Sequence, residues 1–171
     1  MSVAMNTDEK FYENDNGVYF KSGYPSQWFI ASCVDSNGVK YNCCEQWMMH
    51  SKANYFGDLE TAERIMATQD PKEQKKLGRE VKNFNEYAWN TIADLVVYSA
   101  NFAKFSQNEE LKTLLLATGT KQIVECSPYD KIWGNGLDIT TTLTTPEKEW
   151  KGCNRLGKAI MRVRNNLASG M

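Results

Sequence analysis

The chain has 171 residues, of which 42% are hydrophobic and 24% are charged, and its formal net charge is −1 at pH 7. This length and composition indicate a single folded domain with a sizeable core. A net charge so close to zero excludes a broad basic face that grips nucleic acid regardless of sequence, although a local contact with a nucleic-acid substrate stays open.

The cysteines and the single histidine restrict the chemistry further. The five cysteines form no C-x-x-C pair, and His50 has no second histidine with which to share a metal. The pattern argues against a zinc site or a disulfide framework and favours reduced thiols. The first ten residues lack an apolar signal region, and the apolar runs are too short to span a membrane. We therefore expect a cytoplasmic protein, or a nuclear one in a eukaryotic cell.

The first third of the chain carries the strand signals. We expect a flexible segment over residues 1–17 and a single domain over 18–171. Aromatic and β-branched residues predict short strands at 18–20 and 28–31, and a Ser-Asn-Gly turn predicts a return strand at 39–41.

The next stretch predicts the helix on which the chemistry depends. Asn42 can act as its N-cap, and Glu45 can reach back to the Asn42 N–H as in a capping box. Glu45 and Lys52 then share one helix face, roughly 10 Å apart along the axis, and could close on a small ligand. A carboxylate and an amine in one pocket can transfer protons and form covalent bonds. The ordinary alternative is a capping Glu45 and a solvated Lys52.

Helix signals dominate the remainder, so the predicted fold class is mainly α (α+β), with a few short strands near the N-terminus. Helices are expected from Asp58, from Asp70-Pro71 to Gly78, after Asn108 and from Asn154. A long helix over 84–105 is predicted to bury a stripe of apolar residues, with Trp89 and Lys104 on its flank. That stripe consists of Phe84, Ala88, Ile92, Leu95 and Phe102. Residues 123–125 are expected to be extended, and 126–150 to form one long loop.

Two segments near the C-terminus offer further functional groups. In the predicted loop, Trp133 provides a stacking face, Asp130 a carboxylate and Gly134 a close backbone approach. The start of the last helix, at Asn154 and Arg155, could hold a phosphate. Each has an ordinary alternative, namely a turn anchored by a Trp and a capped helix with a surface Arg. Likewise, Trp89 is more typical of a core, and Lys104 of a helix edge.

Several motifs, in order, resemble the NADAR family, named for a predicted link to NAD and ADP-ribose. The segment Lys21-Ser22-Gly23-Tyr24-Pro25 departs from the family, which often has Ser-Asn-Phe before its first Pro. The matching motifs are Cys44-Glu45-Gln46-Trp47-Met48-Met49-His50-Ser51-Lys52-Ala53, Phe56-Gly57-Asp58, Leu77-Gly78-Arg79, Ala88-Trp89, Ala103-Lys104-Phe105-Ser106-Gln107-Asn108, Leu114 to Gly119, Val124-Glu125, Ser127-Pro128-Tyr129-Asp130-Lys131-Ile132-Trp133-Gly134-Asn135-Gly136, Trp150-Lys151-Gly152 and Asn154-Arg155-Leu156-Gly157, with Met161 and Arg164.

The resemblance implies an N-glycosidase of α-rich fold. One substrate class in the family is ADP-ribose attached to guanine bases, and the other is the phosphoribosylamino-pyrimidine intermediates of riboflavin synthesis. We favour the first, with ADP-ribosylated guanine nucleotide or DNA as substrate and ADP-ribose as product. No cofactor, metal, membrane or obligate protein partner is expected.

The resemblance places Glu45, Lys52, Trp89, Asp130 and Trp133 in the pocket. A neutral Lys52 could attack C1′ of the ribose and form a Schiff base, with Glu45 or Asp130 moving protons. Gly134, Arg79, Lys104, Asn154 and Arg155 complete the predicted substrate contacts. The competing hypotheses are a non-catalytic ADP-ribose-binding module, which would not need Glu45 and Lys52 together, and a purely structural α-domain.

Overall fold

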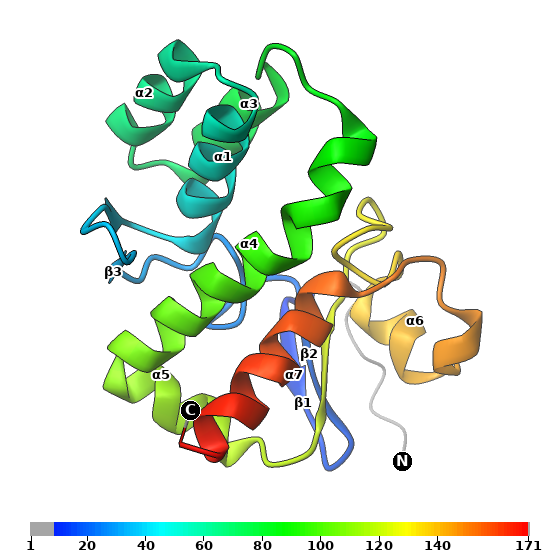
Figure 1. The fold of residues 1–171 in the computed structure, drawn as a ribbon. Coiled ribbons are helices and arrows are strands. Elements are labelled where there is room, and N and C mark those ends of the chain that lie inside the picture. Colours follow the sequence, from blue (N-terminus) through cyan, green and yellow to red (C-terminus); the bar gives the residue numbers. More distant parts are fainter. Residues whose placement is uncertain (1–8, 171) are drawn as a thin grey trace. The chain divides into compact units, whose positions relative to one another are not determined.

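The computed structural model describes residues 9–170 (Figure 1). By its contacts, the chain divides into two compact units. One is residues 27–113, here called the inserted unit, and the other combines the segments before and after it, here called the flanking unit. The described residues form seven α-helices and five short strands, so the predicted fold class is confirmed. Whether the chain acts as one domain stays a prediction, and each unit is described by itself.

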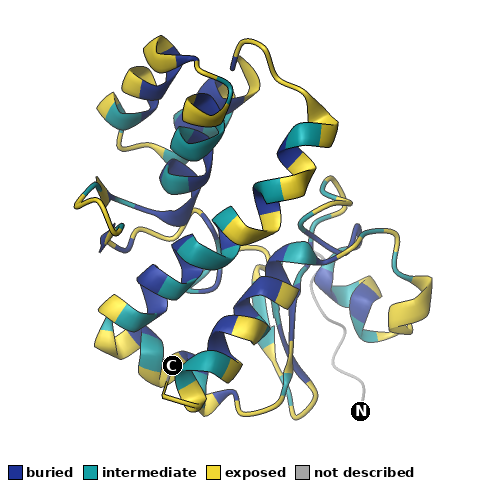
Figure 2. Cartoon of the chain, viewed as in Figure 1, coloured by how far each residue is buried: buried dark blue, intermediate teal, exposed yellow. Residues whose placement is uncertain are grey.

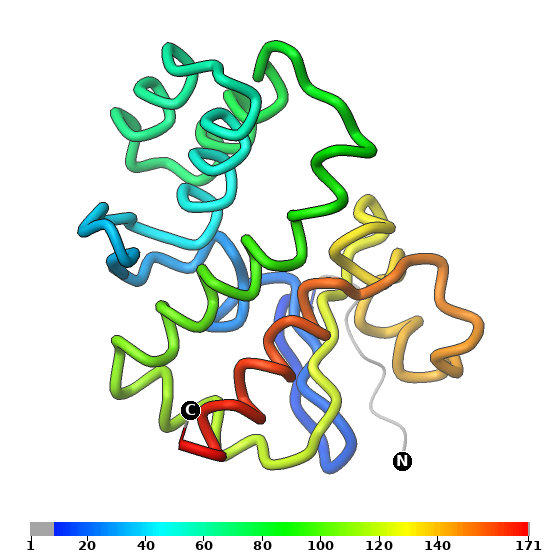
Figure 3. The backbone as a smooth tube through the Cα atoms, in the orientation of Figure 1, coloured from blue at the N-terminus to red at the C-terminus, as the bar shows by residue number. Residues whose placement is uncertain are grey.

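The flanking unit is a small sheet packed against one helix. Its strands lie in the order β1 (Phe11–Glu13), β2 (Gly17–Phe20) and β5 (Gln122–Glu125), and β2 is antiparallel to β1 but parallel to β5. Helix α7 (Arg155–Ala168) packs on β5, as the tube in Figure 3 shows. The apolar residues of this sheet and helix are fully or almost fully buried, namely Val18, Phe20, Ile123, Val124, Leu156, Ile160 and Val163.

The N-terminal segment is structured earlier than its sequence predicts. Residues 1–8 of the segment expected to be flexible, 1–17, lie outside the described residues. Residues Phe11–Glu13 form strand β1, because each of them pairs with a residue of β2. Strand β1 therefore lies within the segment 1–17 that the sequence predicts to be flexible.

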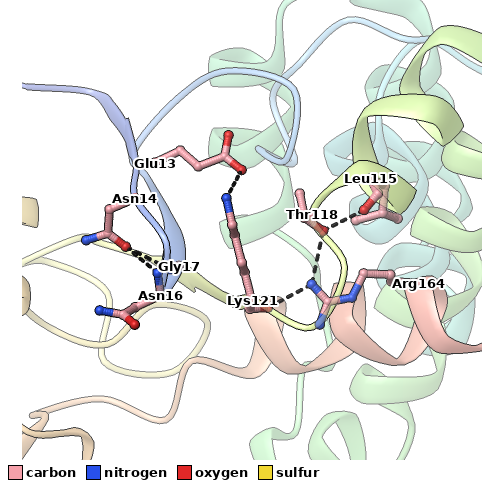
Figure 4. A network of polar contacts seen from close by, with 8 residues as sticks. All are labelled: Glu13, Asn14, Asn16, Gly17, Leu115, Thr118, Lys121 and Arg164. Carbon is pink, nitrogen blue, oxygen red and sulfur yellow. Dashed lines mark hydrogen bonds and ion pairs between the residues drawn. The ribbon is translucent and has the colours of Figure 1, made fainter.

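Arg164 of α7 ties that helix to the connection between helix α5 and strand β5 (Figure 4). Its Nη1 atom donates hydrogen bonds to the hydroxyl of Thr118, at 3.0 Å, and to the carbonyl of Lys121, at 2.7 Å. Lys121 in turn forms an ion pair with Glu13 of β1, at 3.1 Å. A buried arginine that satisfies two acceptors in a turn has a structural role, which accounts for its place among the family motifs.

The segment 126–150, predicted to be one long loop, contains two helical elements. Helix α6 (Ile139–Leu143) starts where the Asp138 side chain accepts the Thr141 N–H at 2.7 Å, and a 3₁₀ helix follows at Glu147–Glu149. The sequence did not predict α6 because the helix is rich in threonine, and β-branched residues have low helix propensity. An N-cap and the buried Ile139 outweigh that propensity.

The inserted unit begins with a hairpin and continues as a helical bundle. Strands β3 (Cys33–Val34) and β4 (Lys40–Tyr41) pair in antiparallel fashion. Helix α1 (Cys44–Tyr55) contacts the three helices that follow it. These are α2 (Leu59–Ala67), α3 (Pro71–Arg79) and α4 (Glu86–Gln107), after which α5 (Glu109–Ala117) runs on into the flanking unit.

The prediction of a strand at 28–31 is wrong, although the hairpin itself was expected. Trp28, Phe29 and Ile30 are exposed and belong to no strand, and β4 pairs with Cys33–Val34 instead. Aromatic and β-branched content indicates a strand only where a neighbouring strand can pair with it.

The buried face of α4 is not the predicted one (Figure 2). Leu95 is 66% exposed, and Phe84, which lies before the helix, is 44% exposed. The buried side chains are mostly small, namely Ala93, Val97, Ala100 and Ala103, together with Trp89, Asn101, Lys104 and Phe105. A stripe chosen by the largest apolar residues therefore lay on the wrong side of the helix.

Candidate functional site

The start of α1 differs from the predicted capping box. The N-cap position belongs to Cys43, and the Asn42 N–H donates to Oε1 of Gln46 at 2.8 Å. The amide nitrogen of Gln46 donates to the carbonyls of Ile65 and Thr68, at 3.3 and 3.2 Å. The capping role assigned to Glu45 is therefore performed by Gln46. Glu45 itself is buried, with only 6% of its surface exposed.

The amine of Lys52 lies at a defined place on the same helix. It donates a hydrogen bond to the Gly78 carbonyl at 2.8 Å and lies 4.4 Å from the centroid of the Phe84 ring. Partial burial lowers the pKa of Lys52; the charge of Glu45 opposes this, and that of Arg79 adds to it. Burial thus shifts this amine toward its neutral, nucleophilic form.

Gly78 allows α3 to approach α1 at this point. A Cβ atom added to Gly78 would overlap the sulfur of Met49 on α1. The missing side chain therefore permits the close approach through which the Gly78 carbonyl reaches the Lys52 amine. Arg79, the last residue of α3, is exposed, and its charge acts on the same amine.

Two of the predicted substrate contacts of the inserted unit are buried. Trp89 is 7% exposed, and Lys104 has no exposed surface. The Lys104 amine lies 5.5 and 5.0 Å from the ring centroids of Phe29 and Phe105, and burial lowers the pKa of Lys104, although the Cys44 thiol opposes this. A substrate could reach Lys104 only if this packing opened.

The loop before α6 carries the predicted groups of the flanking unit. One carboxylate oxygen of Asp130 accepts the N–H groups of Ile132 and Trp133, at 3.0 and 2.8 Å. Asp130 thus fixes the turn that presents Trp133. The guanidinium carbon of Arg155 lies 4.5 Å from the centroid of the Trp133 ring. The indole and this cation form one composite surface.

The start of α7 gives its N–H groups to this loop. Those of Cys153, Asn154, Arg155 and Leu156 donate to the carbonyls of residues 131, 134, 132 and 133, respectively. Hydrogen bonding at this terminus is therefore directed to protein, and Arg155 contributes to the surface through its side chain. The predicted phosphate role of these N–H groups is thus opposed by the contacts, while that of the Arg155 side chain stays a prediction.

Asn154 has an internal role at the same place. Its backbone has a left-handed conformation (φ 49°), and its side chain donates to the Ile123 carbonyl and accepts the Glu125 N–H, both at 3.0 Å. A Cβ atom at Gly157 would overlap both the Ile123 carbonyl and the Asn154 amide. The predicted substrate-binding Asn154 therefore joins β5 to α7.

The structure thus brings the predicted residues together in two sets. Glu45, Arg79 and Lys52 interact within the inserted unit, and Asp130, Trp133, Gly134, Asn154 and Arg155 lie within one network of the flanking unit. Sequence reasoning missed Phe84, Gln46 and the contact of Gly78. The one usable signal was Asn85, whose side chain caps α4 by accepting the Ala88 N–H at 2.8 Å and so places Phe84 outside the helix.

Two remaining expectations concern disulfides and membrane-spanning helices. Cys33, Cys43, Cys44 and Cys126 are buried free thiols, and Cys153 is an exposed one. That these cysteines form no disulfide framework stays a prediction. Between residues 9 and 170, no helix is long and apolar enough to cross a membrane.

Comparison with known proteins identifies the family. The family model described as "NADAR domain" matches residues 10–168. The chain is 42% identical over 156 residues to N-glycosidase R617 of Acanthamoeba polyphaga mimivirus, covering 89% of each chain. It is 32% identical over 140 residues to N-glycosidase YbiA of Escherichia coli, covering 82% of this chain and 79% of YbiA.

The NMR structure of YbiA is similar in fold. It has a TM-score of 0.74 to this chain, with 26% identity, and the match covers 97% of this chain and 95% of that one. The resemblance seen in the motifs thus extends over nearly the whole described chain. The chain belongs to the NADAR domain family, which it shares with the N-glycosidases R617 and YbiA.

Proposed function

We propose that this protein is an N-glycosidase that removes ADP-ribose from ADP-ribosylated guanine bases in nucleic acid, with Lys52 as a Schiff-base nucleophile. The observation that carries the proposal is the Lys52 amine, which burial shifts toward the neutral form on a helix that also holds the buried Glu45. The N-glycosidase names of the relatives R617 and YbiA support the reaction class, and the description of the family supports a ligand related to ADP-ribose.

The first half of the proposed reaction breaks the bond between ribose and base. A proton delivered to the ring oxygen opens the ribose, and the electron pair of the base nitrogen forms an iminium at C1′. The neutral Lys52 amine attacks C1′ and gives up a proton, the base nitrogen takes up a proton, and the C1′–N bond to guanine breaks. We assign the proton transfers to Glu45. The guanine leaves unmodified and still part of the nucleic acid, and C1′ remains bound to Lys52 as a Schiff base.

The second half regenerates the enzyme. Water adds to C1′ of the Schiff base, and a proton passes to the Lys52 nitrogen. The carbinolamine then collapses, which releases the ribose as an aldehyde that closes to ADP-ribose. The net change is the addition of one water molecule across the N-glycosidic bond, and no redox partner is needed.

The loop of the flanking unit has a binding role in this proposal. The face of Trp133, together with the Arg155 guanidinium 4.5 Å away, offers a surface for a base or a phosphate. Asp130 is assigned to holding the turn, because its carboxylate already accepts two backbone N–H groups.

The proposal is tested by supplying ADP-ribosylated guanine DNA and measuring the release of ADP-ribose, and by separately supplying phosphoribosylamino-pyrimidine intermediates and measuring the release of the free pyrimidine. Release from the first but not the second supports the proposal, and the reverse would identify the alternative substrate class. Binding of ADP-ribose without release from either would indicate a non-catalytic module. We expect hydrolysis to continue in EDTA; loss in EDTA with rescue by a divalent ion would contradict the metal-free chemistry.

Trapping tests the nucleophile. Borohydride added during turnover is expected to reduce the Schiff base and leave a ribosyl adduct on the peptide that contains Lys52. The Lys52→Ala variant should lose adduct and turnover but still fold and bind ADP-ribose. Lys158→Ala, a change at an exposed lysine of α7, is the matched control. An adduct on Lys104, or normal turnover by Lys52→Ala, would show that another group is the nucleophile.

A further inference from the structure

Phe84 is an exposed ring that contacts an aromatic ring and the amine of Lys52. It precedes the N-cap of α4, is 44% exposed, and packs edge-on against Phe56 with centroids 5.4 Å apart. Phe56 packs in the same way against Tyr55, at 5.0 Å. The Lys52 amine lies 4.4 Å from the Phe84 centroid. An aromatic ring left this exposed contributes little to the core, so its contact with Lys52 calls for another explanation.

The ring and the Gly78 carbonyl act on the amine in the same direction. The face of an aromatic ring is electronegative and attracts a cation, and a carbonyl oxygen accepts a stronger hydrogen bond from an ammonium than from a neutral amine. The charged groups that act on the amine are Glu45 on α1, which favours the ammonium, and Arg79 on α3, which disfavours it. Two neutral groups therefore act with Glu45 in favour of the ammonium, against the effect of burial, which lowers the pKa of Lys52.

We propose that Phe84 is a positioning residue for Lys52, whose ring holds the amine as an ammonium at a fixed place until it moves onto a substrate. The amine becomes a nucleophile after it loses a proton and leaves the ring face. The importance of this device rests on the function proposed for Lys52, but the contact can be measured without any substrate.

The test is competitive acetylation of the intact protein with acetic anhydride over a range of pH, with each lysine quantified by mass spectrometry. Phe84→Leu keeps an apolar side chain over the amine but removes the ring face. We expect Lys52 to label roughly two- to fivefold faster at neutral pH in this variant, since a cation–π contact at an exposed site has that effect on the neutral fraction. Phe84→Tyr keeps the ring and should label like wild type.

Phe84→Ala distinguishes the effect of the ring face on the Lys52 amine from the exclusion of water by the side chain. Removal of the whole side chain admits water, which favours the ammonium and should partly or wholly cancel the gain seen with Phe84→Leu. The exposed Lys158 should label equally in all variants. Phe84→Ile serves as a second ring-free variant if Phe84→Leu fails to fold by circular dichroism. Unchanged or slower labelling of Lys52 in the folded Phe84→Leu variant, or in Phe84→Ile where that one replaces it, would overturn the proposal.

This outcome is separable from the fate of the proposed function. If Lys52 labels faster in Phe84→Leu but Lys52→Ala turns over normally, the positioning contact is real and the proposed nucleophile is wrong. If labelling is unchanged but Lys52→Ala is inactive, the nucleophile is supported and the role of Phe84 is refuted.

Discussion

The guanidinium of Arg155 covers one face of the Trp133 indole, at 4.5 Å from the ring centroid. The two side chains come from different elements, the loop 126–136 and the first turn of α7, and backbone hydrogen bonds hold those elements together. A planar ligand that stacks on Trp133 would therefore meet either the opposite face of the indole or a displaced arginine.

We expect Trp133→Ala to weaken binding of ADP-ribose by about 1–3 kcal/mol, the usual contribution of base–aromatic stacking, and Trp133→Phe to recover part of it. Calorimetric titration with ADP-ribose measures the effect, with circular dichroism as the test of folding. Loss of folding in Trp133→Ala, with Trp fluorescence of the wild type unchanged by ligand, would identify Trp133 as a core anchor.

Glu45→Gln is expected to retain the fold, because Gln46 and not Glu45 accepts the Asn42 N–H. It should reduce turnover by roughly 10²–10⁴-fold if Glu45 transfers protons. The same change removes a charge that raises the pKa of Lys52, so the Lys52 amine should acetylate faster although turnover falls. Turnover that falls together with slower labelling would instead indicate that the variant has lost the local structure.

Gln46→Ala should destabilise the protein by roughly 1–3 kcal/mol, since it removes three hydrogen bonds to backbone groups. Gln46→Glu keeps an acceptor for Asn42 but loses the donors to Ile65 and Thr68, and should also destabilise. Urea unfolding measures both. Gln69→Ala, a change at an exposed glutamine of the same unit, is the control, and equal midpoints for all three variants would refute the capping role.

Lys104→Met tests the consequence of the buried amine. Burial lowers the pKa of Lys104 in the folded state, so between that value and about 10.4 the unfolded chain binds more protons. The free energy of unfolding therefore rises with pH over this window. Below the window the buried amine is charged, which destabilises the folded state. Relative to Lys104→Met, the wild type should gain stability as pH increases, by about 1.4 kcal/mol for each unit by which the pKa is depressed.

The buried thiols have raised pKa values, so their contribution to stability falls as pH rises. Comparing wild type with Lys104→Met removes this contribution, because both proteins contain the same thiols. Burial raises the pKa of Cys44 to about 12, and that thiol is present in both proteins. Lys158→Met, at an exposed site, should show no such gain. A pH-independent difference between wild type and Lys104→Met would show that the amine titrates normally.

The sequence near each helix start predicted where helices begin, but the sequence along α4 did not predict which face of that helix is buried. Asp58 and Asp70 do cap α2 and α3, since their side chains accept the N–H groups of Thr61 and Lys72. These caps could be predicted because capping depends on a few adjacent residues. The buried face of α4 depends on which neighbours pack against it, and there the small Ala93 is buried while Leu95 is exposed. Size and hydrophobicity along one helix do not contain that information.

The candidate site shows the same division. The electrostatic influence of Glu45 on Lys52 could be predicted, because both residues belong to one helix. The contact of Lys52 with Phe84 could not, because it joins residues 32 positions apart through the turn between α3 and α4, which no periodicity describes.

The parallel pairing of β2 with β5 sets an order of assembly during synthesis. Residues 17–20 leave the ribosome long before residues 122–125, and the whole inserted unit is made between them. Until then β2 has β1 as its partner on one side and an open edge on the other, the kind of edge that pairs with other chains. A nascent chain stalled before Gln122 would thus carry a helical bundle able to fold beside a half-made sheet prone to aggregate.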